Sequence, residues 1–281
     1  MSIAIVTDST SDMPPHMAQE LGVSVVPLSV IFGEEAYKEG VDITPDLFYE
    51  RLQSAKDLPT TSAPSVGDFL STYREALKTT NEIISIHLSS KLSATYDAAC
   101  QAAAQLADEG ARIDVVDSQS ISVGMMFLTM AASKAAREGA TIEEIRKTID
   151  SMTPRLRIYI VLDTLEYVRR GGRIGRARAF LGTLLRVKPV LSIKDGEVHP
   201  EERVRTRAHA LDRIFQLATS YPSIEQIGVA YSTNAEEADG MKRRLEEALE
   251  GTKVSMARLG PVIGVHGGPG VLGIGVLEGD H

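Results

Sequence analysis

The sequence predicts an α/β fold in two domains: an N-terminal parallel sheet with helices on both faces, and a C-terminal mixed sheet with helices. Before Pro154, short apolar runs alternate with helical patterns, which is typical of a parallel sheet with crossover helices. After it, Asp195-Gly196 separates two strand-like runs, which indicates an antiparallel hairpin. The 281 residues suffice for two domains, which we place at 1–153 and 154–281.

The N-terminal strands are predicted from short runs of branched apolar residues. These runs are Ile3–Val6, Val23–Phe32, Glu82–His87 and Arg112–Val116.

The helix Val66–Leu77 is predicted from apolar residues at three- to four-residue spacing, and several other N-terminal helices are predicted from the residues at their starts. Asp12 can cap a helix whose first turn holds Pro14 and Pro15, and Thr141 with Glu144 has the pattern of a capping box. The other helices are predicted at Thr44–Ala55, at Val66–Leu77, at Ser93–Leu106, and from the end of the loop Asp117–Ser122 to about Glu138. The stretch Leu58–Ser65 is predicted as a loop, because prolines and hydroxyl residues fill most of it.

The C-terminal half combines a hairpin with further strands and helices. Strands are predicted at Arg157–Leu162, Val187–Ile193, Glu197–Arg203, Ile227–Tyr231 and Lys253–Arg258. Helices are predicted near Arg176–Leu185 and at Arg205–Ser220 and Ala235–Leu249. The glycine-rich run Gly171–Gly175 is interpreted as a turn that ends a helix.

The stretch Gly260–Gly275 contains seven glycines among its sixteen residues, together with His266. We interpret Pro261–Val265 and Val271–Leu277 as strands around a turn at His266–Gly270. The amides of such a turn are little shielded by side chains and can form an anion site, with His266 at its edge. The alternative is a tight hairpin with a structural histidine.

Composition and charge narrow the functional classes. A chain that is 43% hydrophobic and 24% charged is typical of a globular protein, and no apolar run approaches the roughly 20 residues needed to span a bilayer. We see no signal peptide, and the single Cys100 excludes an internal disulfide, so a cytoplasmic protein is expected. Neither histidine spacing nor cysteine content indicates a metal site, and no phosphate-binding loop of nucleotide enzymes is present.

Positive charge is concentrated in one stretch of an otherwise acidic chain. Residues 155–207 hold thirteen Lys or Arg and six Asp or Glu, whereas the whole chain has a net charge of −8. This asymmetry indicates an interaction face. Nucleic acid is excluded as a partner, because the basic stretch has no interleaved aromatics or recognised motif. An acidic protein or a phosphate-bearing ligand fits better.

Four hydroxyl-rich loops follow strands or precede helices: TDSTSD, TTSAPS, SSKLS and DSQSIS. Loops at the carboxyl ends of parallel strands are the usual ligand site of an open α/β sheet. Ser93 lies where a loop becomes a helix, a position that favours a carboxylate or phosphate. Helix capping alone is the alternative for each loop. Ser93 and His266 could also form a nucleophile–base pair, although the strand–turn–helix motif of serine hydrolases is absent.

Seven motifs in order along nearly the whole chain resemble the DegV family. They are TDSTSD at 7–12, TTSAPS at 60–65, SSKLSATY at 89–96, DSQSISVG at 117–124, DTLEYVRRGGRIG at 163–175, KPVL at 188–191 and GPVIGVHGGPG at 260–270. One departure is Ala94, where the family usually has glycine.

The resemblance implies a two-domain protein that binds a long-chain fatty acid between its domains, in an apolar tunnel. By this resemblance, Thr61, Ser62, Ser93, His266 and Gly267 would hold the carboxylate. The protein would have no catalytic activity or cofactor of its own.

The resemblance also implies partners. Members of this family present the fatty acid to a separate ATP-binding kinase subunit, which forms an acyl phosphate. Arg169, Arg170 and Arg173 would contact that partner or the phosphate, and transient membrane contact is allowed. The alternatives are a serine esterase or acyltransferase that uses Ser93 and His266, and a lipid-sensing module without phosphoryl transfer.

Overall fold

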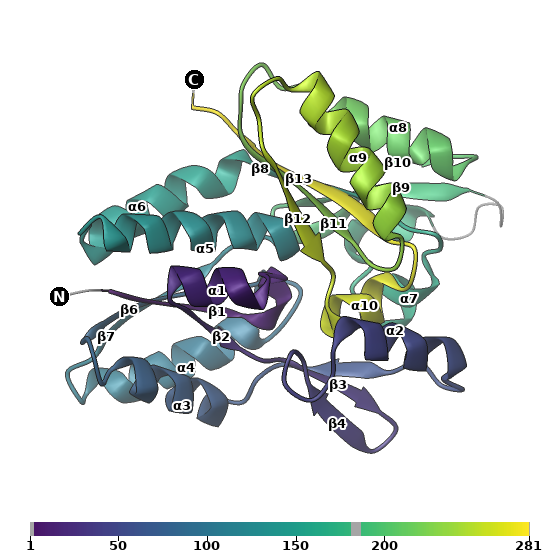
Figure 1. Cartoon of the computed structure of the whole chain (residues 1–281). Coiled ribbons are helices and arrows are strands. Elements are labelled where there is room, and N and C mark those ends of the chain that lie inside the picture. The colour runs from purple at the N-terminus through teal and green to yellow at the C-terminus, as the bar shows by residue number, and fades with distance from the viewer. Residues whose placement is uncertain (1–2, 181–186, 281) are drawn as a thin grey trace.

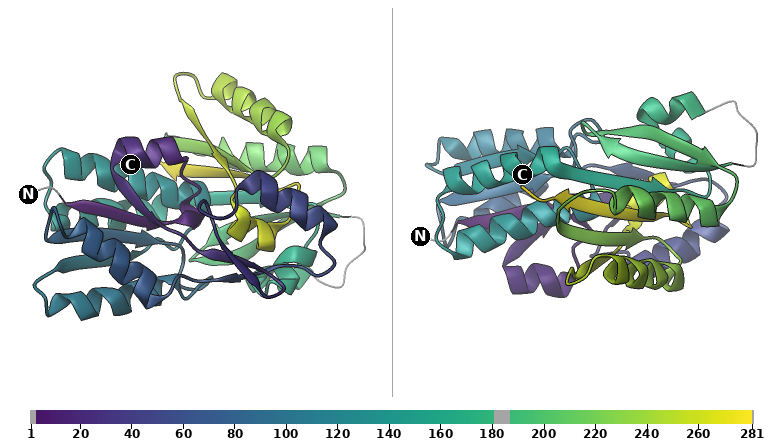
Figure 2. Two further views of the ribbon diagram at one scale, coloured as in Figure 1. Left: turned by 60° about the horizontal axis from the view of Figure 1, so that its bottom comes forward. Right: turned by 90° about the horizontal axis from the view of Figure 1, so that it is seen from above.

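The computed structural model describes residues 3–180 and 187–280, which form the layered α/β arrangement of Figure 1. The first sheet contains four parallel strands in the order β2 (Val23–Val26), β1 (Ala4–Asp8), β6 (Glu82–His87) and β7 (Arg112–Asp117). Helices lie on both of its faces (Figures 1 and 2). One face packs against α3 (Val66–Ala76) and α4 (Thr95–Ala107), and the other against α1 (Pro15–Leu21), α5 (Ser122–Arg137) and α6 (Ile142–Met152). This confirms the predicted parallel sheet.

A small antiparallel sheet projects from this half, with the order β4 (Glu35–Lys38), β3 (Ser29–Phe32) and β5 (Thr60–Ser62). The prediction of one strand at Val23–Phe32 was wrong, because β2 and β3 belong to different sheets. Pro27 has no amide hydrogen for a sheet ladder, and Leu28 donates its amide to Ser9 Oγ at 3.0 Å instead. The predicted loop at Leu58–Ser65 likewise contains β5. Helix α2 (Pro45–Ser54) follows Thr44, as predicted.

The second sheet is mixed and has six strands. Its order is β10 (Glu197–Val204), β9 (Lys188–Lys194), β8 (Leu156–Val161), β13 (Leu272–Glu278), β11 (Ile224–Tyr231) and β12 (Val254–Arg258). Among these described strands, only β11 and β12 pair in parallel. The hairpin at Asp195-Gly196 is confirmed. Helices α8 (Arg207–Ala218) and α9 (Ala235–Ala248) cover one face. The strands of the two large sheets come from residues 4–117 and 156–278, and the boundary at 153/154 stays a prediction.

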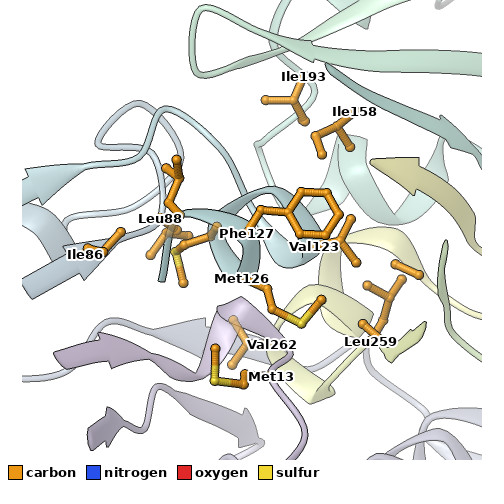
Figure 3. Packing of buried hydrophobic residues seen from close by; sticks show 14 of the residues in the cluster. Met13, Ile86, Leu88, Val123, Met126, Phe127, Ile158, Ile193, Leu259 and Val262 are labelled. Carbon is orange, nitrogen blue, oxygen red and sulfur yellow. The ribbon is translucent and has the colours of Figure 1, made fainter. Parts of the chain in front are cut away.

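Helix α5 packs between the two large sheets. Its residues Val123 and Phe127 point toward the second sheet, near Ile158 of β8 (Figure 3). A Cβ at Gly275 of β13 would lie 2.4 Å from Val123 Cγ2, so the glycine permits this close approach. The apolar core is therefore continuous from one sheet to the other.

The interpretation of Pro261–Val265 as a strand was wrong. These residues open helix α10 (Pro261–Gly267), with Gly260 at the N-cap and Pro261 in the first turn. The amides of Gly260 at the N-cap and of Val262 in the first turn donate to carboxylates from the other end of the chain, which a local pattern cannot reveal.

The proposed capping role of Asp12 was also wrong. Asp12 adopts a left-handed backbone conformation (φ 50°) and accepts the Gly260 amide, while α1 begins at Pro15 without a side-chain cap. The capping box of Thr141 and Glu144 is confirmed.

Two helix boundaries differ from the predictions. Helix α4 begins at Thr95 rather than Ser93, and the predicted helix near Arg176–Leu185 is a 3-10 helix, η3 (Gly175–Phe180), as far as the structure describes it; positions 181–185 lie outside the described residues. A short helix, α7 (Glu166–Arg170), ends at Gly171, in agreement with the interpretation of Gly171–Gly175. None of the helices formed by residues 3–180 and 187–280 has the length and apolar character needed to cross a bilayer.

Candidate functional site

A cavity of about 230 Å³ lies between the two halves of the chain. Its walls are mostly aliphatic and come from the N-terminal half of the chain and from β8, β9, β10, α7 and α10 of the C-terminal half. The aliphatic residues include Leu28, Leu88, Ile121, Ile160, Leu162 and Leu191. Among the described residues, five polar side chains also line it: Thr10, Thr61, Ser93, Arg173 and His266. An elongated apolar molecule with one polar end matches this lining.

His266 and Thr61 form the central polar contact of the cavity. Thr61 Oγ1 lies 3.0 Å from His266 Nε2, although the two residues are 205 positions apart. Burial, and secondarily the positive charge of Arg173, lower the pKa of His266 to about 4, so the imidazole is neutral at pH 7. If the ring proton is on Nε2, His266 donates to Thr61, and the Thr61 hydroxyl is free to donate to an oxyanion.

The backbone of α7 covers the other ring nitrogen of His266. A Cβ at Gly171 would lie 2.2 Å from Nδ1, so the glycine lets the imidazole pack directly on the end of this helix. Nδ1 is buried and has no hydrogen-bond partner among the residues that the structure describes. The ring is therefore held by packing on one side and by Thr61 on the other.

Ser93 lies at the start of α4 and also lines the cavity. Its Oγ lies 2.9 Å from Thr95 Oγ1 and accepts the Thr95 amide at 3.3 Å, so the Ser93 hydroxyl caps the helix in part. Within the described chain, no hydrogen bond joins Ser93 to His266. The two side chains face the same cavity but do not form a nucleophile–base pair in this structure.

Ser62 is not brought to the cavity, although Gly267 is. Side chains alternate between the two faces of a strand, and β5 turns Thr61 inward and Thr60 and Ser62 outward. Ser62 is exposed, and its hydroxyl donates to the Ala63 carbonyl at 3.1 Å. The assignment of Thr61, Ser93, His266 and Gly267 to a carboxylate stays a prediction about residues that the fold gathers; Ser62 is the exception.

The three arginines singled out from the sequence are placed differently. Arg169 and Arg170 form ion pairs with Glu166 on α7. Arg173 is exposed and also lines the cavity, where its Nε donates to the Leu92 carbonyl at 3.1 Å. Of the three, only Arg173 lies where the cavity meets the surface.

Sequence reasoning missed Thr10 as a cavity residue. Its hydroxyl donates to Asp8 Oδ1 at 2.5 Å, and Asp8 is also bound to the His87 ring at 3.0 Å and to the Leu88 amide. The other ring nitrogen of His87, Nε2, forms a hydrogen bond with Ser85 Oγ at 2.7 Å. The side chains of Ser85, His87 and Asp8 are completely buried, so this Ser–His–Asp arrangement is structural. The loop TDSTSD was the available signal for Thr10.

Comparison with known proteins supports a family assignment. The family model described as "Uncharacterised protein, DegV family" matches residues 2–279. A DegV domain-containing protein from Halalkalibacterium halodurans is 40% identical over 276 residues, which is 97% of each chain. The protein DegV from Bacillus subtilis is 36% identical over 280 residues, or 98% of each.

Solved structures agree with these sequence relatives. A DegV family protein from Thermus thermophilus, described for its fatty acid binding, has a TM-score of 0.90 and 35% identity, with 99% of this chain and 100% of that one covered. A stearic acid-binding protein from Eubacterium ventriosum has a TM-score of 0.92 and 30% identity, with 98% of each chain covered. By sequence over nearly its full length and by fold, this chain belongs to the DegV family.

Proposed function

We propose that this protein binds a long-chain fatty acid, with the acyl chain in the aliphatic cavity and the carboxylate at Thr61, Ser93, His266 and the Gly267 backbone. The observation that carries the proposal is the pairing of Thr61 with a neutral His266 inside a cavity whose walls are otherwise mainly aliphatic. The fatty acid-binding relatives from Thermus thermophilus and Eubacterium ventriosum support the same ligand class.

The two parts of such a ligand would contribute differently. Burial of a methylene is worth about 0.8 kcal/mol, so some fourteen methylenes give an upper figure of roughly 11 kcal/mol. The loss of translational and rotational freedom on binding and the desolvation of the carboxylate each oppose binding by roughly several kcal/mol. The tail therefore supplies affinity, and the hydroxyl and imidazole donors keep the carboxylate from being buried without hydrogen bonds.

A direct test is titration of delipidated protein with stearate, comparing Thr61→Val with Thr60→Val. The first change removes the hydroxyl that pairs with His266, and we expect it to weaken binding about tenfold. The second makes the same substitution one residue earlier in β5, on the exposed face, and should leave binding within about twofold. Equal affinities of wild type and Thr61→Val would contradict the assigned head-group site, and no binding by wild type would contradict the ligand.

We further propose that the protein presents the carboxylate to a separate ATP-dependent kinase subunit and does not itself catalyse the phosphoryl transfer. The neutral hydroxyl–imidazole cluster supports this role, because it would leave the carboxylate charge largely unneutralised and open to phosphorylation. Arg173 supports it as well, since an exposed cation at the cavity opening suits an acyl phosphate or an acidic partner.

The partner role can be tested by ATP-dependent acyl-phosphate formation in the presence of a fatty acid kinase ATP-binding subunit. Arg173→Glu should lower the rate at least tenfold at saturating fatty acid, a condition under which a change in fatty acid affinity does not contribute. Arg243→Glu makes the same charge change at an exposed position of α9, away from the cavity, and serves as the control. An unchanged rate for Arg173→Glu would remove this arginine from the proposal.

A further inference from the structure

Two carboxyl groups are buried beside the proposed head-group site without lining its cavity. Asp12 is 8% exposed and Glu39 is 6% exposed, and both lie in the N-terminal half of the chain. Burial raises the pKa of both carboxyl groups, that of Glu39 to about 7. At Asp12, the negative charge of Glu39 raises the pKa further. Buried carboxyls without a cationic partner are costly, which calls for a role that accounts for them.

Both carboxyls bind the start of α10. Asp12 Oδ1 accepts the Gly260 amide at 2.8 Å, and Glu39 Oε1 accepts the Val262 amide at 2.9 Å. These amides have no partner within the helix, and acidic groups are favoured at this end of a helix. A Cβ at Gly260 would lie 2.2 Å from Glu39 Oε1, so the helix start is seated directly on this side chain.

The rest of α10 also rests on the N-terminal half. Tyr49 of α2 donates its hydroxyl to the Leu259 carbonyl at 3.3 Å, just before the helix. A Cβ at Gly264 would lie 2.5 Å from Phe48 Cε1, so α2 packs closely along the helix. Figure 1 shows α10 next to α2, although the two helices come from opposite ends of the chain. The start and middle of α10 are thus held by the N-terminal half, whereas its end packs on α7.

The end of the same helix carries the proposed head-group residues. Val262, Ile263, His266 and Gly267 all line the cavity, and His266 pairs with Thr61 of β5. Val262 therefore joins the two regions: its amide is bound by Glu39 and its side chain faces the cavity. A displacement of the helix start along its axis would move His266 relative to Thr61.

We propose that Asp12 and Glu39 are positioning residues that fix α10 against the N-terminal half and thereby place His266 and Gly267 for the ligand carboxylate. This inference rests on the proposed fatty acid-binding function. Neither residue touches the cavity. Their effect on fatty acid affinity is transmitted through the seven residues of α10.

The carboxyl pair has few other charged neighbours. Asp8 and Tyr49 face it, and Arg258, which acts on Tyr49, is paired with Asp46 at 2.8 Å. The Ser122 and Ser9 hydroxyls partly offset the burial of Asp12 and Glu39 respectively. Besides these hydroxyls, the carboxyls are held by the Gly260 and Val262 amides at the start of α10.

The first experiment measures stearate affinity for Glu39→Ala, Glu39→Gln and Glu144→Ala. Glu39→Ala removes the acceptor for the Val262 amide, and we expect about tenfold weaker binding. Glu39→Gln keeps an acceptor oxygen of the same reach and should restore affinity to within about threefold of wild type. Glu144→Ala removes the capping carboxylate of α6, far from the cavity, and should change affinity less than twofold.

The second experiment follows the His266 ring nitrogens by NMR in ligand-free protein. Glu39→Ala should shift their signals, whereas Glu144→Ala should not. Unshifted signals together with unchanged stearate affinity in a folded Glu39→Ala protein would overturn the inference. Failure of wild-type protein to bind stearate would instead contradict the proposed function, while a shift of the His266 signals would still support the positioning role.

Discussion

His266 is the residue whose titration the structure constrains most clearly. Its pKa is lowered to about 4 in the folded protein by burial, against an ordinary value of 6.5. The unfolded chain therefore binds a proton in the window between these values, and the folded chain does not. The neutral imidazole contributes stability that is fully present above pH 6.5 and is lost as the pH falls toward 4.

We expect wild type to lose up to about 2 kcal/mol more stability than His266→Gln between pH 7 and pH 5. Urea unfolding at the two pH values measures this difference. The comparison with the variant is needed because Glu39, whose pKa is raised to about 7, changes stability in the opposite direction over the same range. Parallel pH profiles for the two proteins would show that His266 is not shielded as described.

The close packing of Gly171 on His266 leads to a second prediction. Its φ of −69° is open to any residue, so Gly171→Ala acts through its methyl group, which would lie 2.2 Å from His266 Nδ1. The imidazole must shift, and we expect stearate affinity to fall about tenfold.

Gly240→Ala is the matched control for Gly171→Ala. It adds a methyl group to α9 where no atom other than the adjacent helix backbone lies within 4 Å, and it should leave affinity unchanged and stability equal or higher by up to about 1 kcal/mol. If the two variants bind stearate equally well, the close packing of His266 on Gly171 has no bearing on the site.

The sequence indicated both Thr61 and Ser62 as site residues, but it did not show which of the two faces the cavity. The hydroxyl-rich loop and its resemblance to the DegV family indicated both residues. Because the segment was predicted as a loop, nothing in the sequence separated their directions. Once Thr60–Ser62 pairs with β3, strand alternation sends Thr61 inward and Ser62 outward.

At the scale of elements, strands and helices with a strong local pattern were predicted well. The parallel strands β1, β6 and β7 and the hairpin at Asp195-Gly196 are examples. Helix α10 was missed because its branched residues favour a strand, and because the carboxylates that bind the amides at its start lie more than 200 residues earlier. Glu39 likewise carried no signal, since only the folded chain brings it to Val262.

Strand β13 supports a prediction about packing. Gly275 faces α5, and a methyl group there would lie 2.4 Å from Val123 Cγ2 in the fully packed core. We expect Gly275→Ala to lower the free energy of unfolding by about 1–3 kcal/mol. Urea denaturation against wild type checks this, with Gly67→Ala in α3 as a control, because its nearest neighbour is the Ser65 hydroxyl at 3.6 Å. A wild-type stability for Gly275→Ala would contradict the packing of α5 on this strand.

At the scale of the whole molecule, the cavity takes its walls from both halves of the chain, and α5 packs against both large sheets. A bound fatty acid should therefore stabilise the two halves together. At a free ligand concentration of 100 times Kd we expect a gain of about 2.7 kcal/mol. Hydrogen exchange with and without stearate should show slower exchange in β6 and in β8. Protection confined to one half would contradict a ligand shared between them.

Fatty acid binding is best tested by denaturing extraction of the purified protein, followed by mass spectrometry of the released small molecules. We expect about one long-chain fatty acid per chain. Recovery of a fatty acid at that ratio would also report which chain length the cavity prefers. A protein that releases no fatty acid, and takes up none when long-chain fatty acids are added, would contradict fatty acid binding.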